Sequence, residues 1–158
     1  MAFPHVDFNT YTALRDMDIS HPDIDGSWRL GQMTSWTRWG TATGDLDPIT
    51  AHSAEEFEQL PPFSTRVILF AINLGGTEMR SDLEDWRNFH SQGHRGDGTL
   101  KNSIALAKDG LPGAEEIPAL YMTDVFKLVP TKTAARLDSK IKQDLVAGID
   151  HVERCAAI

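Results

Sequence analysis

The feature that most constrains the fold is a continuous apolar run that ends on an amide side chain and two glycines. It reads Arg66-Val67-Ile68-Leu69-Phe70-Ala71-Ile72-Asn73-Leu74-Gly75-Gly76. An apolar run bounded by turn residues is typical of a strand that is buried on both faces of a sheet. The glycines permit backbone angles that other residues resist. The run therefore predicts an inner strand over 66–72 and a tight loop at its carboxyl end.

A second segment has the same form further along the chain. It reads Ile117-Pro118-Ala119-Leu120-Tyr121-Met122-Thr123-Asp124, and it predicts a strand over 118–125. In an open α/β sheet, ligands bind outside the carboxyl ends of the strands. We therefore expect the two strands to bring Asn73 and either Thr123 or Asp124 to the same edge of the sheet.

Two patterns outside these strands predict helices. Ser53 followed by Glu56 forms a capping box, which predicts a short helix over 53–60. Three glycines predict a loop over 91–98, and the apolar spacing after it predicts a helix over 99–108.

The last segment, 133–158, has the clearest amphipathic pattern in the chain. Its apolar residues follow helical spacing and are Leu137, Ile141, Leu145, Ile149, Val152 and Ala156. We expect one continuous helix here, not closed by a glycine, a proline or a polar cap. Residues 1–27 are rich in Asp, Pro and Asn, so we expect an irregular segment with only a weak helical pattern over 11–17.

The segment 28–40 contains three of the four tryptophans: Trp28, Trp36 and Trp39. Tryptophan stacks on nucleic-acid bases, with about 1–3 kcal/mol per base, but it is also a common core residue. We expect a core role for at least two of the three. The segment is also a candidate for a further strand, because two strands are too few for a stable parallel sheet.

The composition limits the kind of protein and the kind of partner. A chain of 158 residues with 41% hydrophobic and 24% charged residues is typical of one globular domain. The net charge of −8 argues against broad electrostatic binding to nucleic acid, although a local cationic rim remains compatible with it. No apolar run approaches the roughly 20 residues of a membrane span. The single cysteine, Cys155, fits a reducing cytosol, so we expect a cytoplasmic protein.

Four segments, in this order, resemble the uracil-DNA glycosylase-like superfamily, especially its less-characterised bacterial and phage branch. They are Ser35-Trp36-Thr37-Arg38-Trp39-Gly40, Phe70-Ala71-Ile72-Asn73-Leu74-Gly75-Gly76, Trp86-Arg87-Asn88-Phe89-His90 and Ala119-Leu120-Tyr121-Met122-Thr123-Asp124-Val125-Phe126-Lys127. They lie within 28–130, in a chain that we expect to form one domain over 1–158. The resemblance implies a three-layer α/β/α fold with a short parallel sheet. It also implies a hydrolase of DNA repair, which cleaves the N-glycosidic bond of a deaminated or damaged base without a metal or organic cofactor.

The resemblance also implies roles for individual residues, with single- or double-stranded DNA as the partner. Asn73 would place the attacking water, although a neutral amide cannot itself accept a proton. Trp86 or Phe89 would stack on the flipped base, and Asp124 or Thr123 would read its edge. The other residues expected to bind the substrate are Ile72, Leu74, Gly75, Gly76, His90 and Lys127. Without the resemblance, the better explanation of Asn73 is a residue that caps the turn after the strand.

Members of that superfamily carry a further part of the sheet, which ends in a loop with a catalytic histidine. We expect this part to be missing after Ile158, and His151 does not match that histidine by position. The fold is therefore expected to be incomplete at its C-terminus. A second hypothesis stays open, in which a shortened, non-catalytic relative binds nucleic acid or protein. Its open sheet edge would favour self-association.

Overall fold

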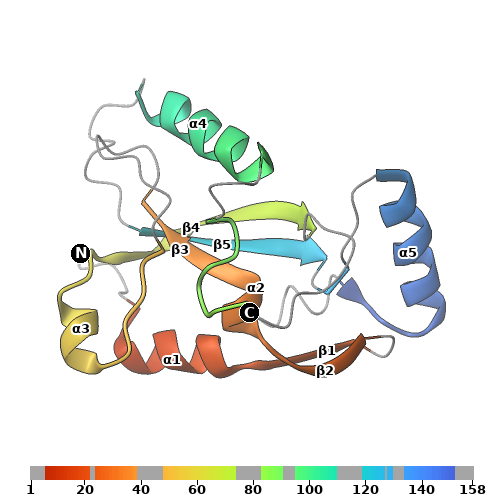
Figure 1. The fold of residues 1–158 in the computed structure, drawn as a ribbon, viewed down its shortest axis with the longest axis horizontal. Coiled ribbons are helices and arrows are strands. Elements are labelled where there is room, and N and C mark those ends of the chain that lie inside the picture. Colours follow the sequence, from red (N-terminus) through yellow and green to blue (C-terminus); the bar gives the residue numbers. More distant parts are fainter. Residues whose placement is uncertain are drawn as a thin grey trace.

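The structure, a computed structural model, describes residues 6–21, 24–38, 48–73, 83–90, 95–109, 119–126, 128–129 and 134–151. Figure 1 shows a mixed α/β arrangement with one three-stranded and one two-stranded sheet. The helices are α1 (Phe8–Asp16), α2 (Leu30–Met33), α3 (Ala54–Glu58), α4 (Arg95–Asp109) and α5 (Ala134–Val146). The strands are β1 (Asp18–His21), β2 (Ile24–Arg29), β3 (Thr34–Thr37), β4 (Phe63–Asn73) and β5 (Ala119–Phe126). None of the described helices is long and apolar enough to cross a membrane.

The larger sheet has the strand order β3-β5-β4, with β5 in the centre. The two strands expected from the sequence are present and are parallel neighbours, and the tryptophan-rich segment supplies β3. The expectation that 66–72 forms an inner strand buried on both faces is wrong, because β4 is at the edge of the sheet and exposes Val67, Ile68 and Phe70. A continuous apolar run predicts a strand but does not fix its place in the sheet.

The short parallel sheet that the resemblance implies is present only in part: β4 and β5 are parallel, but β3 is antiparallel to β5. The direction of so short a strand is not encoded in its own residues. Strand β3 follows α2 directly in the chain, and the Gly31 and Met33 carbonyls of α2 accept hydrogen bonds from the 83–90 segment.

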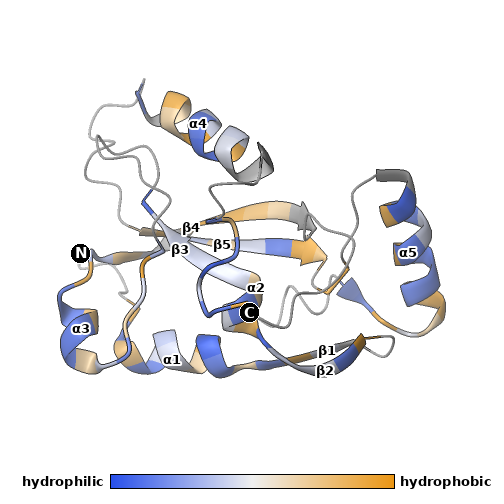
Figure 2. Cartoon of the chain, viewed as in Figure 1, coloured by the Kyte–Doolittle hydropathy of each residue, from blue (hydrophilic) through white to orange (hydrophobic). Residues whose placement is uncertain are grey.

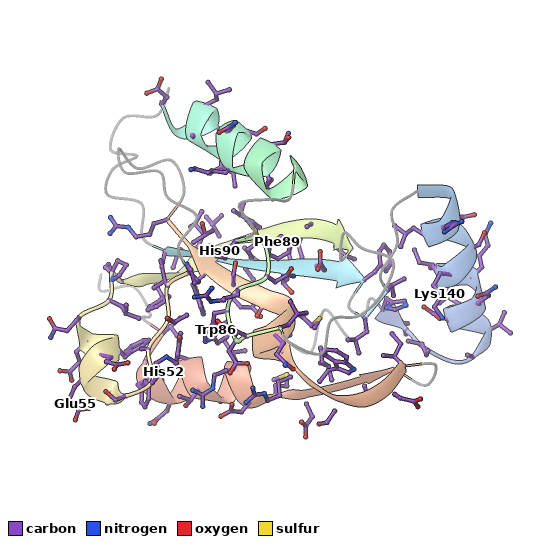
Figure 3. All side chains as sticks on the ribbon, viewed as in Figure 1. His52, Glu55, Trp86, Phe89, His90 and Lys140 are labelled. Carbon is purple, nitrogen blue, oxygen red and sulfur yellow. The ribbon has the colours of Figure 1, made fainter. Side chains whose placement is uncertain are left out.

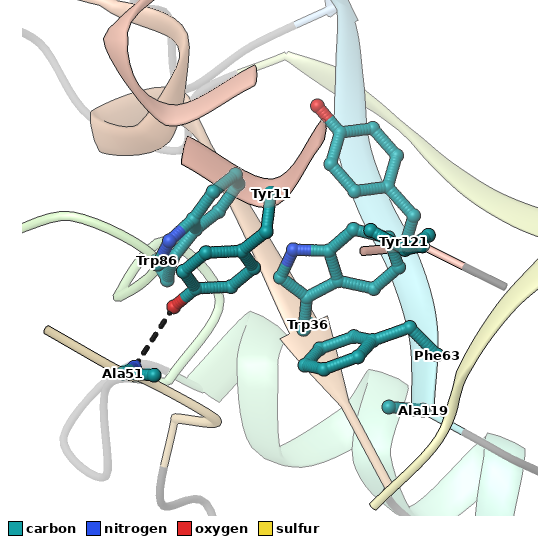
Figure 4. Close-up of a cluster of buried hydrophobic side chains, with 8 residues drawn as sticks. Tyr11, Trp36, Ala51, Phe63, Trp86, Ala119 and Tyr121 are labelled. Carbon is teal, nitrogen blue, oxygen red and sulfur yellow. Dashed lines mark hydrogen bonds between the residues drawn. The ribbon is translucent and has the colours of Figure 1, made fainter. Parts of the chain in front are cut away.

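One face of the three-stranded sheet carries an aromatic cluster, which comprises Tyr11, Trp36, Phe63, Trp86 and Tyr121 (Figure 4). The ring centroids of Trp36 and Phe63 lie 4.6 Å apart, and those of Tyr11 and Trp86 lie 5.1 Å apart. Tyr11 belongs to α1, so this helix covers the face. Large rings in such edge-on and tilted contacts contribute much of the stability of a core.

The opposite face of the sheet packs against α4. Met122 alternates with Tyr121 along β5 and therefore points to this second face. It forms a smaller cluster with Phe89 and with Leu69 of β4, and Leu100 and Ile104 of α4 pack against it. Helix α1 thus packs on one face of the sheet and α4 on the other (Figure 1), while Ile68 and Phe70 of β4 stay exposed.

The expected core role for the tryptophans of 28–40 is confirmed for two of them. Trp36 belongs to the aromatic cluster, and Trp28 packs with Met33 and Leu128. Trp39 lies outside the described residues.

The N-terminal segment is more regular than its composition indicates. The side chain of Asp7 caps α1 by accepting a hydrogen bond of 2.7 Å from the Thr10 N–H. Strands β1 and β2 then form an antiparallel pair, in which Ile19 lies opposite Trp28. The expectation of an irregular segment over 1–27 is therefore wrong for these elements. Strands this short and polar carry too little periodicity to be recognised from the sequence.

Two helices differ from expectation only in their extent. In α3 the N-cap is confirmed, since the Ser53 hydroxyl accepts from the Glu56 N–H at 3.2 Å. The Glu56 carboxylate accepts from the His52 N–H at 2.7 Å, one residue before the position that a capping box requires. Helix α4 begins at Arg95, so the loop expected over 91–98 is wrong for its last four residues. A glycine inside a helix costs about 1 kcal/mol relative to alanine, and the packing of α4 on the sheet offsets such a cost.

Helix α5 is shorter than the expected helix over 133–158, and that expectation is wrong. Gly148 has a φ of 80°, the left-handed conformation that glycine adopts without strain. Its N–H donates to the Leu145 carbonyl, and the Ile149 N–H donates to the Asp144 carbonyl at 2.9 Å. These two bonds form a Schellman motif, which ends the helix.

The hydroxyl of Tyr11 provides the first testable prediction. It accepts a hydrogen bond of 3.0 Å from the Ala51 N–H, and burial in the aromatic cluster raises the pKa of Tyr11 to about 12. Because the unfolded chain loses this proton near pH 10, the folded state holds it more tightly, and stability falls as the pH rises from about 10 to 12. We expect this phenol to contribute a loss of about 1 kcal/mol by about pH 11.

The variant Tyr11→Phe tests this. At neutral pH it should be less stable than the wild type by about 1–3 kcal/mol, since the buried Ala51 N–H loses its acceptor. Urea unfolding on both sides of about pH 10 would show the gap between the two proteins narrowing at alkaline pH. A gap that stays constant would contradict the assignment of the shift to Tyr11.

Candidate functional site

The candidate site lies at the carboxyl ends of the parallel strands β4 and β5. In the register of the two strands, Asn73 is opposite Phe126 and Ala71 is opposite Asp124. The backbones of Asn73 and Asp124 therefore stand at the same end of the sheet, two positions apart on neighbouring strands. For Ile72 and Asn73 the structure describes the backbone alone. The remaining loop and substrate candidates lie outside the described residues and are Leu74, Gly75, Gly76 and Lys127.

Asp124 is held in place by a residue that the sequence analysis did not select, Asn88. The Asn88 side-chain amide donates to Asp124 Oδ2 at 3.1 Å and to the Met33 carbonyl at 2.8 Å. Its oxygen accepts from the Phe89 N–H at 3.2 Å. Asp124 is 1% exposed, and a buried carboxylate is costly unless it is hydrogen-bonded. The feature of the sequence that could have identified Asn88 as a site residue is its polar side chain within the aromatic stretch 86–90.

The segment 83–90 carries backbone strain next to this pair. Trp86 has a φ of 62° and Phe89 a φ of 71°, which are uncommon values for bulky side chains. Such residues persist where the surrounding structure fixes them, and they cluster at functional sites. Here the Trp86 N–H donates to the Gly31 carbonyl at 2.6 Å. An ion pair of 3.1 Å between Arg29 and Asp85 holds the segment to β2.

Burial raises the pKa of Asp85, and the charges of Arg29 and Arg15 oppose this rise. The Asp85 carboxylate is therefore partly shielded from water, and the positive charges of the neighbouring guanidinium groups favour its ionised form. It anchors the segment to β2 through Arg29.

The two aromatic candidates of this segment lie in different places (Figure 3). The Trp86 ring is 1% exposed inside the aromatic cluster, between Tyr11 and Trp36. Phe89 lies on the other face of the sheet, against Met122, which is also the face of Asp124. The geometry thus groups Phe89 with Asp124 and Asn88, and it gives Trp86 a core position.

The remaining candidates of the described part flank this group. Thr123 alternates with Asp124 along β5 and therefore points to the opposite face, where it is buried opposite Thr34. His90 follows Phe89 and is half-buried, and its backbone N–H donates to the Arg87 carbonyl at 3.2 Å.

A buried histidine–carboxylate pair lies at the same end of the sheet. His151 Nε2 is 3.0 Å from Asp144 Oδ2, and Lys140 Nζ is 3.2 Å from Asp144 Oδ1. The His151 ring packs edge-on against Phe126, with ring centroids 5.3 Å apart. Because Phe126 is the register partner of Asn73, the pair lies beside the end of β4 and β5. The expectation that His151 continues an amphipathic helix is wrong, since that helix has already ended.

The titratable side chains described around this end of the sheet are Asp124, His90, Asp144, His151 and Lys140. Within the described ranges, no three His, Cys, Asp or Glu side chains are grouped so that they could hold a metal ion. A comparison of the chain with protein-family models, with curated proteins and with solved structures finds no match.

Proposed function

We propose that the chain is a DNA glycosylase-like protein of the uracil-DNA glycosylase-like superfamily, with a three-layer α/β/α fold. It would hydrolyse the N-glycosidic bond of a deaminated or damaged base. One observation carries the proposal: Asn73 and Asp124 stand together at the carboxyl ends of two parallel strands, where α/β folds bind their ligands. The packing of α1 and α4 on opposite faces of the sheet supports the layered fold.

In this proposal Asn73 orients the attacking water. Its neutral amide does not accept a proton, so the sugar develops positive charge before the water attacks, and electrostatic stabilisation lowers the barrier. Phe89 is the better of the two stacking candidates, because the Trp86 ring is enclosed by other rings.

Asp124 acts in two ways in the proposed site. It accepts from Asn88 at 3.1 Å, and so it fixes the segment that carries Phe89. Asn88 in turn donates to the Met33 carbonyl at 2.8 Å, which ties the same segment to α2. For Asp124 to read the edge of a flipped base, the base therefore has to enter beside the Asn88 amide.

The first prediction for function is the loss of activity in Asn73→Ala. Oligonucleotides that carry uracil, hypoxanthine or xanthine, single- and double-stranded, are incubated with the protein and treated with alkali, which cleaves at abasic sites. We expect the wild type to produce cleavage and Asn73→Ala to be slower by about 100- to 1,000-fold, as when one hydrogen-bond donor to the transition state is removed. The control variant Asn102→Ala changes an exposed asparagine of α4 and should leave the rate unchanged.

The assay also distinguishes the proposed glycosylase from the second hypothesis, a shortened and non-catalytic binding module. No cleavage of any substrate by a folded wild-type protein would reject the glycosylase function. Equal rates for the wild type and a folded Asn73→Ala protein would remove Asn73 from the mechanism.

A second candidate function, a shortened and non-catalytic binding module, is favoured by a different observation. Strand β4 lies at the edge of its sheet and exposes large apolar side chains at Val67, Ile68 and Phe70. Exposed apolar edge strands pair readily with other chains. Protein binding without cleavage in the assay above would support this function.

A further inference from the structure

We draw no further inference here: the strongest candidate, the exposed apolar surface at the edge strand β4 formed by Val67, Ile68 and Phe70 (Figure 2), carries nothing, because nothing in the described part of the structure shows what covers it.

Discussion

Replacing Trp86 with alanine is expected to lower the free energy of unfolding by about 3–5 kcal/mol. The side chain is 1% exposed, and its ring centroid lies 5.1 Å from that of Tyr11, 6.2 Å from that of Trp36 and 6.4 Å from that of Tyr121. Its removal leaves a cavity among rings that cannot close over it. Since domains of this size are stable by about 5–15 kcal/mol, urea unfolding should detect the loss readily.

Two further variants make the Trp86 result interpretable. Trp86→Phe keeps a ring in the cluster and should lose less stability than Trp86→Ala. Phe70→Ala removes a ring that is 56% exposed and should change stability by less than about 1 kcal/mol. A Trp86→Ala protein that is as stable as the wild type but binds base-modified DNA more weakly would return the stacking role to Trp86.

The two strands β4 and β5 could be predicted because their signals are local, although the edge position of β4 could not. In β4 the apolar run itself marks the strand, and the polar residue Asn73 marks its end. In β5 the apolar residues before Thr123 likewise mark the strand. Because two such strands in an α/β protein usually run parallel, their common carboxyl end could also be predicted.

The residues that build the site around these ends could not be found in the same way. Asn88 and Asp124 are 36 positions apart, and no local pattern connects them. Their contact depends on the fold of 83–90, which in turn depends on the left-handed backbone of Trp86 and Phe89. Neither residue type prefers that conformation, so the sequence gives no sign of it.

The end of α5 had a visible signal that was outweighed by periodicity. Gly148 is followed by Ile149, which continues the apolar spacing of Leu137 and Ile141, and this spacing favoured one long helix. In the structure Ile149 is buried after the helix has ended, while Leu145 is 57% exposed. The glycine was the more reliable sign because it satisfies the terminal carbonyl groups through a specific backbone geometry.

The buried pair of Asp144 and His151 is the other feature with a large expected effect. Asp144→Ala should destabilise the protein by about 3–5 kcal/mol, because it leaves a buried imidazole without its carboxylate partner. Both side chains are enclosed, with 0% and 3% exposure, and their atoms are 3.0 Å apart. Urea unfolding at neutral pH measures the change.

The same helix supplies a matched control. Asp138 and Lys142 form an ion pair of 2.8 Å, but both side chains are exposed. Asp138→Ala should therefore cost no more than about 1 kcal/mol. The double variant Asp144→Leu/His151→Phe should recover most of the stability, since apolar residues of similar volume can replace a buried pair. Equal losses for Asp138→Ala and Asp144→Ala would contradict the burial of the pair.

The pair also allows stability to be separated from a role at the candidate site. His151 contacts Phe126, the register partner of Asn73, so the pair is close to the end of β4. Given the proposed glycosylase activity, the stable double variant Asp144→Leu/His151→Phe should cleave base-modified DNA as fast as the wild type if the pair only holds α5 in place. We expect it to be slower, because it replaces the only buried imidazole–carboxylate pair described at this end of the sheet with groups that cannot donate or accept a proton.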